Sequence, residues 1–390
     1  MREIYLDNAA TTKPLECVIE AVSETMRLEY GNPSSLHKKG IEAENKIKES
    51  TAFFANLLGA SEDEIFYTSG GTESNNLAII GSALAYQKTA KRIITTAIEH
   101  PSVGDVFTYL KGQGFDVIIL NVDEKGYINL EELEASINEE TSLVSIMHVN
   151  NEIGTIQDIE KIGALIKKKN PRTLFHVDAV QSFTKIPISV RKAQIDLLSI
   201  SAHKFYGPKG VGLLYKNKKV RLQNMLHGGG QQKNMRSGTE NVPGIYGMYI
   251  AAKYVFNRQR EILEHYKACK TYLYTRILNE IEGTHLNGDV VEVSAPHILN
   301  IAFEDIRAEV LLHALEQNHI YVSSGSACAS NKMSKSGTLA AIGLNGQALD
   351  SAIRFSFSID VTEEDLETCV DVLKKQLVLL RKFTLGGKKR

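Results

Sequence analysis

The chain has 390 residues, of which 43% are hydrophobic and 23% are charged. Both shares are ordinary for a folded globular protein, and they exclude a wholly disordered or collagen-like chain. Because 45 Lys and Arg residues balance 46 Asp and Glu residues, the net charge is −1 at pH 7, and no global field attracts nucleic acid or an anionic membrane. The length predicts two domains, or one large domain with an appendage.

The four cysteines, Cys17, Cys269, Cys328 and Cys369, are far apart in the sequence and match no disulfide or zinc-binding spacing. The N-terminal residues lack a basic stretch followed by an apolar one, and no run approaches the roughly 18 apolar residues of a membrane span. We therefore expect a cytoplasmic protein with no membrane association and no direct nucleic-acid partner.

The first part of the chain reads as an α/β domain. Short β-branched runs alternate with helical patterns, which predicts crossover units and a mostly parallel sheet flanked by helices. Such a sheet binds ligands beyond the C-terminal ends of its strands. In chain order, helices are predicted over 14–27 and 41–57, a strand over 65–68, a helix over 72–85, strands over 92–96, 116–120 and 142–149, a helix over 159–169, and strands over 173–177, 197–200 and 212–215.

The last third of the chain has a different pattern. A long helical stretch over 245–281 is followed by strands predicted over 298–303 and 352–359, which indicates a smaller α+β domain. The last helix opens with Thr362 as its N-cap and Asp365 three residues later, as in a capping box. One face of this helix is apolar and includes Cys369, which we therefore assign to the core.

Lys204 follows the predicted strand 197–200 directly, within the segment 201–210. It therefore lies where an α/β sheet binds its ligands. Such a lysine can be an ordinary surface charge, but a partly buried lysine at this edge is also suited to Schiff-base chemistry.

Two further strand ends carry polar residues that suit a cofactor. Asp178 follows strand 173–177 and either caps the next helix or keeps a pyridine nitrogen protonated, as a pyridoxal phosphate site requires. Strand 65–68 leads into a segment that contains Gly71 and Thr72 and then into a helix, so bare backbone amides face outward where a phosphate fits. The alternative is an ordinary helix start, and the segment is not a Walker A loop.

With these residues in place, the chain resembles cysteine desulfurases of the NifS/IscS type, which belong to the class V, fold-type I pyridoxal phosphate enzymes. The resemblance covers nearly the whole length, with its motifs in the expected order. The matching stretches are 5–12, 31–35, 68–76, 99–100, 148–154, 178–181, 201–210, 236–241 and 323–328.

The resemblance implies roles for residues around the cofactor ring. Lys204 would bind pyridoxal 5'-phosphate as a Schiff base and move protons during turnover. Asp178 would bind the pyridine nitrogen, Gln181 the phenolic oxygen, and His100 would stack on the ring. Without the family, His100 could equally be a turn or core histidine.

The resemblance also implies a phosphate site, a substrate site and a homodimer. The phosphate would be held by Gly71, Thr72, Ser201 and His203, with Thr239 from a second subunit. Asn151, beside the cofactor, and Arg354 would receive the carboxylate of L-cysteine. The alternation along 353–359 turns Arg354 away from the apolar face of its strand, and its guanidinium matches a carboxylate bidentately.

Cys328 lies in a stretch of small residues without apolar periodicity, which predicts an exposed loop. A thiolate on a flexible segment suits attack on the sulfur of a bound cysteine. The segments around Cys17 and Cys269 are helical and apolar, which indicates structural thiols. His148, His176 and His227 form no metal-binding pattern.

We predict a cysteine desulfurase that converts L-cysteine to L-alanine and passes the sulfur from Cys328, as a persulfide, to an acceptor protein. The acceptor serves iron–sulfur cluster assembly or the thiolation of tRNA or cofactors. The basic tail 380–390 lacks the acidic and aromatic extension of iron–sulfur-type members, which favours a tRNA-thiolating enzyme over a cluster scaffold. The alternatives are a selenocysteine lyase, another class V enzyme, or a non-catalytic adaptor in sulfur metabolism.

The predicted domain division has three parts. Residues 1–14 form an N-terminal arm that packs with the small domain, residues 15–258 form the large cofactor-binding domain, and residues 259–390 form the small C-terminal domain that carries Cys328.

Overall fold

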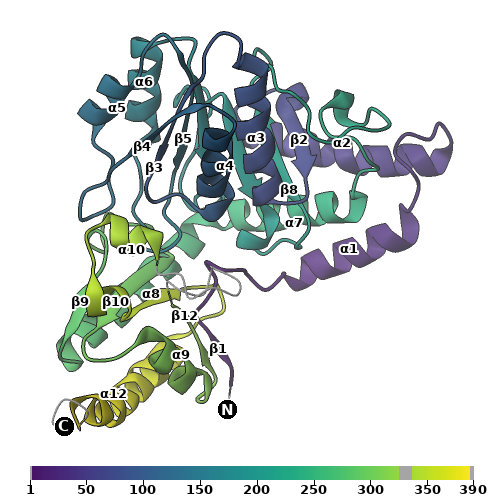
Figure 1. Cartoon of the computed structure of the whole chain (residues 1–390). Coiled ribbons are helices and arrows are strands. Elements are labelled where there is room, and N and C mark those ends of the chain that lie inside the picture. Colours follow the sequence, from purple (N-terminus) through teal and green to yellow (C-terminus); the bar gives the residue numbers. More distant parts are fainter. Residues whose placement is uncertain (1, 325–335, 387–390) are drawn as a thin grey trace.

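The protein is described by a computed structural model that covers residues 2–324 and 336–386. Cys328 lies outside these described residues. Within them, the elements form a larger unit around one sheet and a smaller unit around another, and both termini lie on the side of the smaller unit (Figure 1).

The larger unit contains a seven-stranded sheet in the order β2-β8-β7-β6-β5-β3-β4. Its pairs are parallel except at β8, which is antiparallel to both neighbours. This confirms the predicted α/β fold class. The strands are β2 (Ile65–Thr68), β3 (Arg92–Thr96), β4 (Asp116–Leu120), β5 (Thr141–Met147), β6 (Leu174–Asp178), β7 (Leu197–Ser201) and β8 (Gly212–Lys216).

Helices cover both faces of this sheet. Neighbouring strand residues point to opposite faces, and each face has its own apolar core. Ile93 packs with α3 and α4 on one face, whereas Ile94 packs with α2, α6 and α7 on the other. The helices of this unit are α1 (Glu16–Leu28), α2 (Lys38–Leu58), α3 (Gly71–Tyr86), α4 (Pro101–Gly112), α5 (Leu130–Ser136), α6 (Ile159–Lys169) and α7 (Val242–Asn257).

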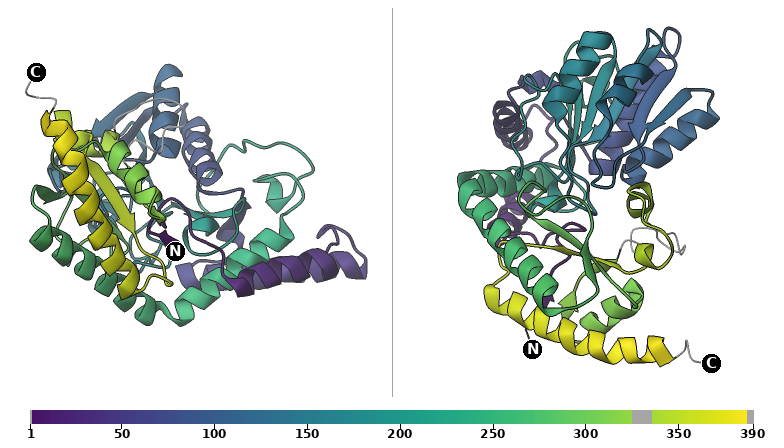
Figure 2. Two further views of the ribbon diagram at one scale, coloured as in Figure 1. Left: turned by 90° about the horizontal axis from the view of Figure 1, so that it is seen from below. Right: turned by 90° about the vertical axis from the view of Figure 1, so that its left-hand side faces the viewer.

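The smaller unit has a four-stranded sheet in the order β12-β13-β10-β9, packed against helices that share one apolar core. In the right-hand view of Figure 2, α12 runs along the outer side of this unit. The elements are α8 (Gln259–Glu280), β9 (Thr284–Leu286), β10 (Ile298–Phe303), α9 (Ala308–Glu316), β11 (Ile320–Tyr321), β12 (Ser323–Ser324), α10 (Gly337–Ala341), α11 (Gly346–Leu349), β13 (Ala352–Ser356) and α12 (Glu363–Gly386).

Two details refine the predicted elements of the C-terminal third. The long helical stretch is two consecutive helices, α7 and α8, separated at Arg258, whose ψ of 17° leaves the helical range. The capping box of α12 is present, since Thr362 N donates to Asp365 Oδ2 (2.9 Å) and Asp365 N donates to Thr362 Oγ1 (3.2 Å). Cys369 is fully buried in the core, as predicted.

The N-terminal arm connects the two units. Its short strand β1 (Ile4–Tyr5) pairs in parallel with β11. Leu6 N donates to Tyr321 O, and Leu6 O accepts from Ser356 N. Residues 8–12 then pass along the edge of the large sheet before α1 begins. These contacts agree with an arm that packs with the smaller unit, and the division at residues 14 and 258 stays a prediction. Within the described residues, no helix is long and apolar enough to cross a bilayer.

Three neighbouring strands in the middle of the large sheet are joined by buried side chains. His176 on β6 lies between Ser145 Oγ on β5 (2.8 Å) and Ser199 Oγ on β7 (3.0 Å), and it is fully buried. Burial lowers the pKa of His176 to about 3, so the ring stays neutral in the folded protein.

We predict that His176 makes the fold sensitive to acid. Because an unfolded histidine has a pKa of about 6.5, the unfolded state takes up a proton that the folded state excludes, and stability falls by about 1.4 kcal/mol for each pH unit below that value. The free energy of unfolding of the wild type should therefore fall faster between about pH 6.5 and 5 than that of His176→Gln, in denaturant titrations. His227→Gln, at an exposed position, is the control, and an equal slope for all three proteins would contradict the prediction.

Candidate functional site

A cavity of about 330 Å³ opens at the C-terminal edge of the large sheet. It lies where β2, β5, β6 and β7 end and where the N-terminal arm passes. The structure brings most of the predicted site residues together here. Those that line the cavity are Gly71, Thr72, His100, Asn151, Asp178, Gln181, Ser201, His203, Lys204 and Arg354.

Lys204 ends a single helical turn, Ala202–Lys204, that follows β7 directly. Its Nζ donates to the carbonyl oxygens of Ala9 (2.7 Å) and Ala10 (2.8 Å) in the arm. Thr12 fixes the same turn, because its Oγ1 donates to His203 O (2.9 Å) and accepts from Tyr206 N (2.6 Å). The arm therefore positions both the lysine amine and the backbone beside it.

Asp178 ends β6 and has only 5% of its surface exposed. Its Oδ2 accepts from Asn75 Nδ2 (2.8 Å), and its Oδ1 accepts from Val180 N (2.9 Å). Within the described residues it forms no ion pair. Since each carboxylate oxygen can accept a second hydrogen bond, Asp178 can still bind a cationic donor in the cavity.

The glycine-rich segment after β2 brings the backbone close to the cavity. Gly70 has a φ of 151°, which L-amino acids rarely adopt, and a Cβ on Gly71 would lie 2.8 Å from Val180 Cγ2. Helix α3 begins at Gly71, so its first backbone N–H groups have no partner within the helix. A phosphate fits at such a helix start, and a side chain on Gly71 would crowd it.

Two histidines beside the cavity are neutral near pH 7. Partial burial lowers the pKa of His203 to about 4, helped by the charges of Lys204, Lys209 and Lys185, and His203 Nδ1 lies 3.1 Å from Thr11 Oγ1. Burial also lowers the pKa of His100. These rings can therefore accept hydrogen bonds or stack without adding charge to the site.

His100 also has a structural role. Its Nδ1 accepts from Ser102 N (3.1 Å), so the ring caps α4, which begins with Pro101 as helix starts often do. His100 is thus a turn histidine that caps a helix, as one interpretation predicted, and its ring also borders the cavity.

Arg354 lies on β13 with 3% of its surface exposed. Its Nη2 forms an ion pair with Asp7 Oδ1 (2.7 Å), and its Nη1 donates to Asn151 O (2.9 Å). The Nε atom is buried without a partner in the described part of the chain. The neighbours Ile353 and Phe355 point into the apolar core, which confirms the predicted alternation.

Gln181 and Thr239 differ in how the structure places them. Gln181 Nε2 donates one of its two N–H groups to Ala9 O (2.8 Å), which leaves the second for a cofactor. Thr239 is exposed and does not line the cavity of its own chain. Its segment is anchored nearby by the ion pair between Arg236 Nε and Glu73 Oε1 (2.8 Å).

Three contributors were not predicted individually: Asn75, Ser102 and Asp7. Asn75 orients Asp178, Ser102 orients His100, and Asp7 pairs with Arg354. Asn75 and Asp7 lie inside motifs that carried the family resemblance, which was the available signal. Their individual partners are distant in the sequence and left no local pattern.

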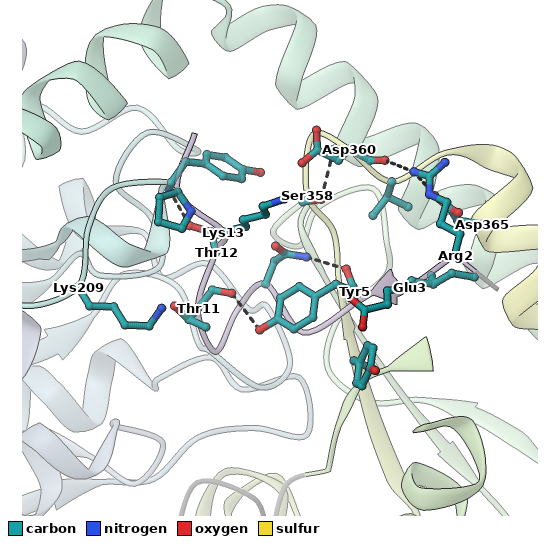
Figure 3. Close-up of a pocket in the computed structure, with 16 residues that line it drawn as sticks. Arg2, Glu3, Tyr5, Thr11, Thr12, Lys13, Lys209, Ser358, Asp360 and Asp365 are labelled. Carbon is teal, nitrogen blue, oxygen red and sulfur yellow. Dashed lines mark hydrogen bonds and ion pairs between the residues drawn. The ribbon is translucent and has the colours of Figure 1, made fainter. Parts of the chain in front are cut away.

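A larger cavity of about 600 Å³ is lined by residues of the N-terminal arm together with Ser358, Asp360 and Asp365 (Figure 3). Tyr5 OH donates to Thr11 O (3.2 Å) along its wall, and Arg2 forms an ion pair with Asp365 (3.1 Å) at one end. None of the predicted site residues lines it. We therefore place the chemistry in the smaller cavity.

Cys269 and Cys369 are poor nucleophiles. Burial raises the pKa of Cys269 to about 11 and that of Cys369 to about 12, which makes their thiolates scarce at neutral pH. Cys17 is half-buried on α1. Among the described residues, no group of His, Cys, Asp and Glu side chains is arranged to hold a metal ion.

Comparison with known proteins agrees with this geometry. Residues 4–369 match the family model "Aminotransferase class-V". The chain is 42% identical to "Putative cysteine desulfurase IscS 1" of Bacillus subtilis, covering 96% of this chain and 100% of that protein. It is 43% identical to "Cysteine desulfurase IscS" of Pectobacterium carotovorum, covering 97% and 93%.

Two solved structures are also similar. The structure titled "NIFS-LIKE PROTEIN" has a TM-score of 0.92 and 40% identity, and the match covers 97% of this chain and 100% of that chain. The structure titled "SspA in complex with cysteine" has a TM-score of 0.79 and 34% identity, covering 91% and 98%. With a family model matched over nearly its whole length, the chain belongs to the class-V aminotransferase family.

Proposed function

We propose that the protein is a pyridoxal phosphate-dependent cysteine desulfurase that converts L-cysteine to L-alanine. One observation carries the proposal: the cavity places a lysine amine, a buried carboxylate and a glycine-rich helix start together at one sheet edge. The match to relatives named cysteine desulfurase, and to a structure titled as a complex with cysteine, supports the choice of substrate.

The residues present fit the cofactor at each of its polar groups. Lys204 would bind its aldehyde carbon, Asp178 its pyridine nitrogen, and Gln181 its phenolic oxygen, while His100 would stack on the ring. The phosphate would lie at Gly71 and Thr72 with Ser201 and His203. When bound, pyridoxal phosphate supplies an electron sink for carbanion chemistry at the substrate.

Arg354 is suited to the substrate carboxylate. Its guanidinium is fixed by Asp7 and by Asn151 O, and its unpartnered Nε is a buried donor that a bound anion would satisfy. A carboxylate on Arg354 would share the guanidinium with Asp7 or displace it. Asn151 lines the same cavity, so its side chain would bind the substrate carboxylate together with Arg354.

Lys204 would carry protons to and from the substrate. Its amine lies against the Ala9 and Ala10 carbonyls, which orient an N–H group but accept no proton themselves at neutral pH. The neutral rings of His100 and His203 do not compete with it as cations.

Cys328, outside the described residues, would receive the sulfur. Its thiolate would attack the substrate sulfur, so that an S–S bond forms as the C–S bond breaks, and the carbon skeleton would leave as alanine after protonation. The raised pKa values of Cys269 and Cys369 support this choice, because buried thiols are inert. A reducing cytoplasm stays the predicted location, since the transfer needs Cys328 as a free thiol.

We predict that Cys328→Ser abolishes persulfide formation and leaves cofactor binding intact, because a hydroxyl is a poor nucleophile near neutral pH. Peptide mass spectrometry after incubation with cysteine should find a persulfide on Cys328 of the wild type and none on the variant. Cys17→Ser is the matched control and should behave as the wild type, whereas Lys204→Ala should lose both the visible cofactor absorbance and alanine release. A persulfide on Cys17, Cys269 or Cys369 would contradict the assignment.

The persulfide would pass to an acceptor protein by attack of the acceptor's thiolate. A tRNA-thiolating enzyme is the proposed acceptor, and a cluster scaffold is the alternative. Transfer of radioactive sulfur from cysteine to each purified acceptor distinguishes them.

We further propose a homodimer whose cofactor sites are shared. Thr239 is exposed on a segment that an ion pair anchors to the start of α3, and it does not line the cavity of its own chain. From there it would reach the site of a neighbouring subunit. Helix α1 also exposes apolar side chains, among them Ile19 (45%) and Met26 (62%), which a second copy would cover.

A mixed dimer tests the shared site. Thr239→Val should weaken cofactor retention, since it removes a hydroxyl from the phosphate site. In a heterodimer of Thr239→Val and Lys204→Ala subunits, one site would regain both Lys204 and Thr239, so that site should bind the cofactor with wild-type affinity in equilibrium dialysis. If Thr239 acted within its own chain, or the protein were a monomer, no wild-type site would appear.

A further inference from the structure

Lys185 is a buried lysine that none of the roles above uses. It has 6% of its surface exposed and follows the segment that carries Asp178 and Gln181. Its Nζ donates to the backbone oxygen of Lys204 at 2.9 Å. In the described part of the chain, this carbonyl is the acceptor that Nζ reaches, and no carboxylate lies within ion-pair distance.

A buried amine without a counter-charge is unfavourable for folding. Burial, together with the charge of Lys204, lowers the pKa of Lys185 to about 7. An apolar side chain of similar length would fill the same space without this cost. The hydrogen bond to Lys204 is therefore the specific contribution that the amine makes.

The turn before Lys185 has an unusual backbone conformation. Thr184 has a φ of 71°, which is rare for a β-branched residue, and its Oγ1 is buried without a partner in the described residues. Gln259 Nε2 donates to Thr184 O (3.0 Å), and Ser182 O accepts from the backbone N–H of Lys185. These two hydrogen bonds hold the backbone from which the Lys185 side chain leaves.

We infer that Lys185 is a positioning residue for Lys204: it fixes the backbone of Lys204 so that the amine stays directed at the cavity. The side chain of Lys204 is long and flexible, and it is already held at its far end by Ala9 and Ala10. With Lys185 on the carbonyl, Lys204 is held at both ends. Reaction at an amine depends steeply on its position, since a displacement of about 1 Å can lower a rate by about 100-fold.

The charged groups near Lys185 are cations or potential cations. Lys204 and His203 face it from the turn after β7, and His297 faces it from the segment before β10. Above about pH 7, Lys185 is uncharged and acts through its hydrogen bond alone. Measurements at about pH 8.5 therefore separate positioning from electrostatic repulsion.

The inference rests on the proposed function of Lys204, and the test distinguishes the two. Lys185→Met removes the donor and keeps an unbranched side chain that lacks only the terminal atom. Lys270→Met is the matched control, because Lys270 is also buried, has a pKa lowered to about 7 by burial, and binds Ser294 Oγ (2.6 Å) and Ala295 O (2.9 Å) away from the cavity. Both variants lose a buried amine, but only the first loses contact with Lys204.

The first measurement uses cofactor-free protein mixed with pyridoxal phosphate at about pH 8.5, with the covalent bond to Lys204 followed by visible absorbance. Lys185→Met should form this bond at least about tenfold more slowly than the wild type, and Lys270→Met should not. Alanine release should show a lower kcat with KM within about twofold, since the carboxylate site is unchanged.

Equal rates in the two variants would overturn the role of Lys185. A wild type that forms no bond at Lys204 would instead overturn the proposed function. If Lys185→Met does not fold, Lys185→Gln provides the same comparison, because its shorter side chain is polar but cannot reach the Lys204 carbonyl as the lysine does.

Discussion

The contact between the Lys204 amine and the carbonyl groups of Ala9 and Ala10 is the constraint on which the site depends. It requires the N-terminal arm to cross the edge of the large sheet, and the arm reaches that position because β1 and Leu6 are bonded to the smaller unit. Gln181 uses the Ala9 carbonyl as well. A few backbone oxygens of the arm therefore link the large sheet, the lysine turn and the smaller unit.

The parallel strands of the large sheet are the second feature that positions the site. Because parallel strands end at one edge, β6 delivers Asp178 and β7 delivers Ser201 and the Lys204 turn to the same cavity. The strands are held in register below the site by the hydrogen bonds of His176 with Ser145 and Ser199. Polar side chains at the centre of a sheet are costly unless satisfied, and here both ring nitrogens have partners. The rigidity of this layer lets short turns place reactive groups accurately.

How far the sequence predicts the structure depends on the range of each interaction. The strands of the large sheet were predicted to within about two residues because β-branched runs between helical patterns are a local signal. The helix break at Arg258 was not predicted, because no Gly or Pro marks it in the sequence. The two-residue strand β1 is too short to show a period.

The site shows the same division. Lys204, Asp178 and Gly71 could be assigned from their positions after strands, which is a local argument. The pair of Arg354 with Asp7 spans 347 positions, and the contact of Asn75 with Asp178 spans 103, so neither follows from spacing. The family motifs contained Asp7 and Asn75 but did not say what they touch. The orientation of side chains within the cavity therefore does not follow from the sequence.

Burial determines which groups in this site can carry charge. It lowers the pKa values of His100 and His203, and it raises the pKa of the enclosed Glu99 carboxyl, next to His100, to about 8. Glu99 Oε1 accepts from Thr96 Oγ1 (2.8 Å) and from Met147 N (2.9 Å), so it supports the floor of the cavity while staying protonated at neutral pH. Because these neighbours are neutral, they do not compete with a cationic partner for the Asp178 carboxylate. The low local dielectric constant makes an ion pair of Asp178 stronger than it would be in water. The same desolvation that costs stability at His176 and Lys185 would therefore strengthen the proposed contact of the Asp178 carboxylate with a protonated ring nitrogen.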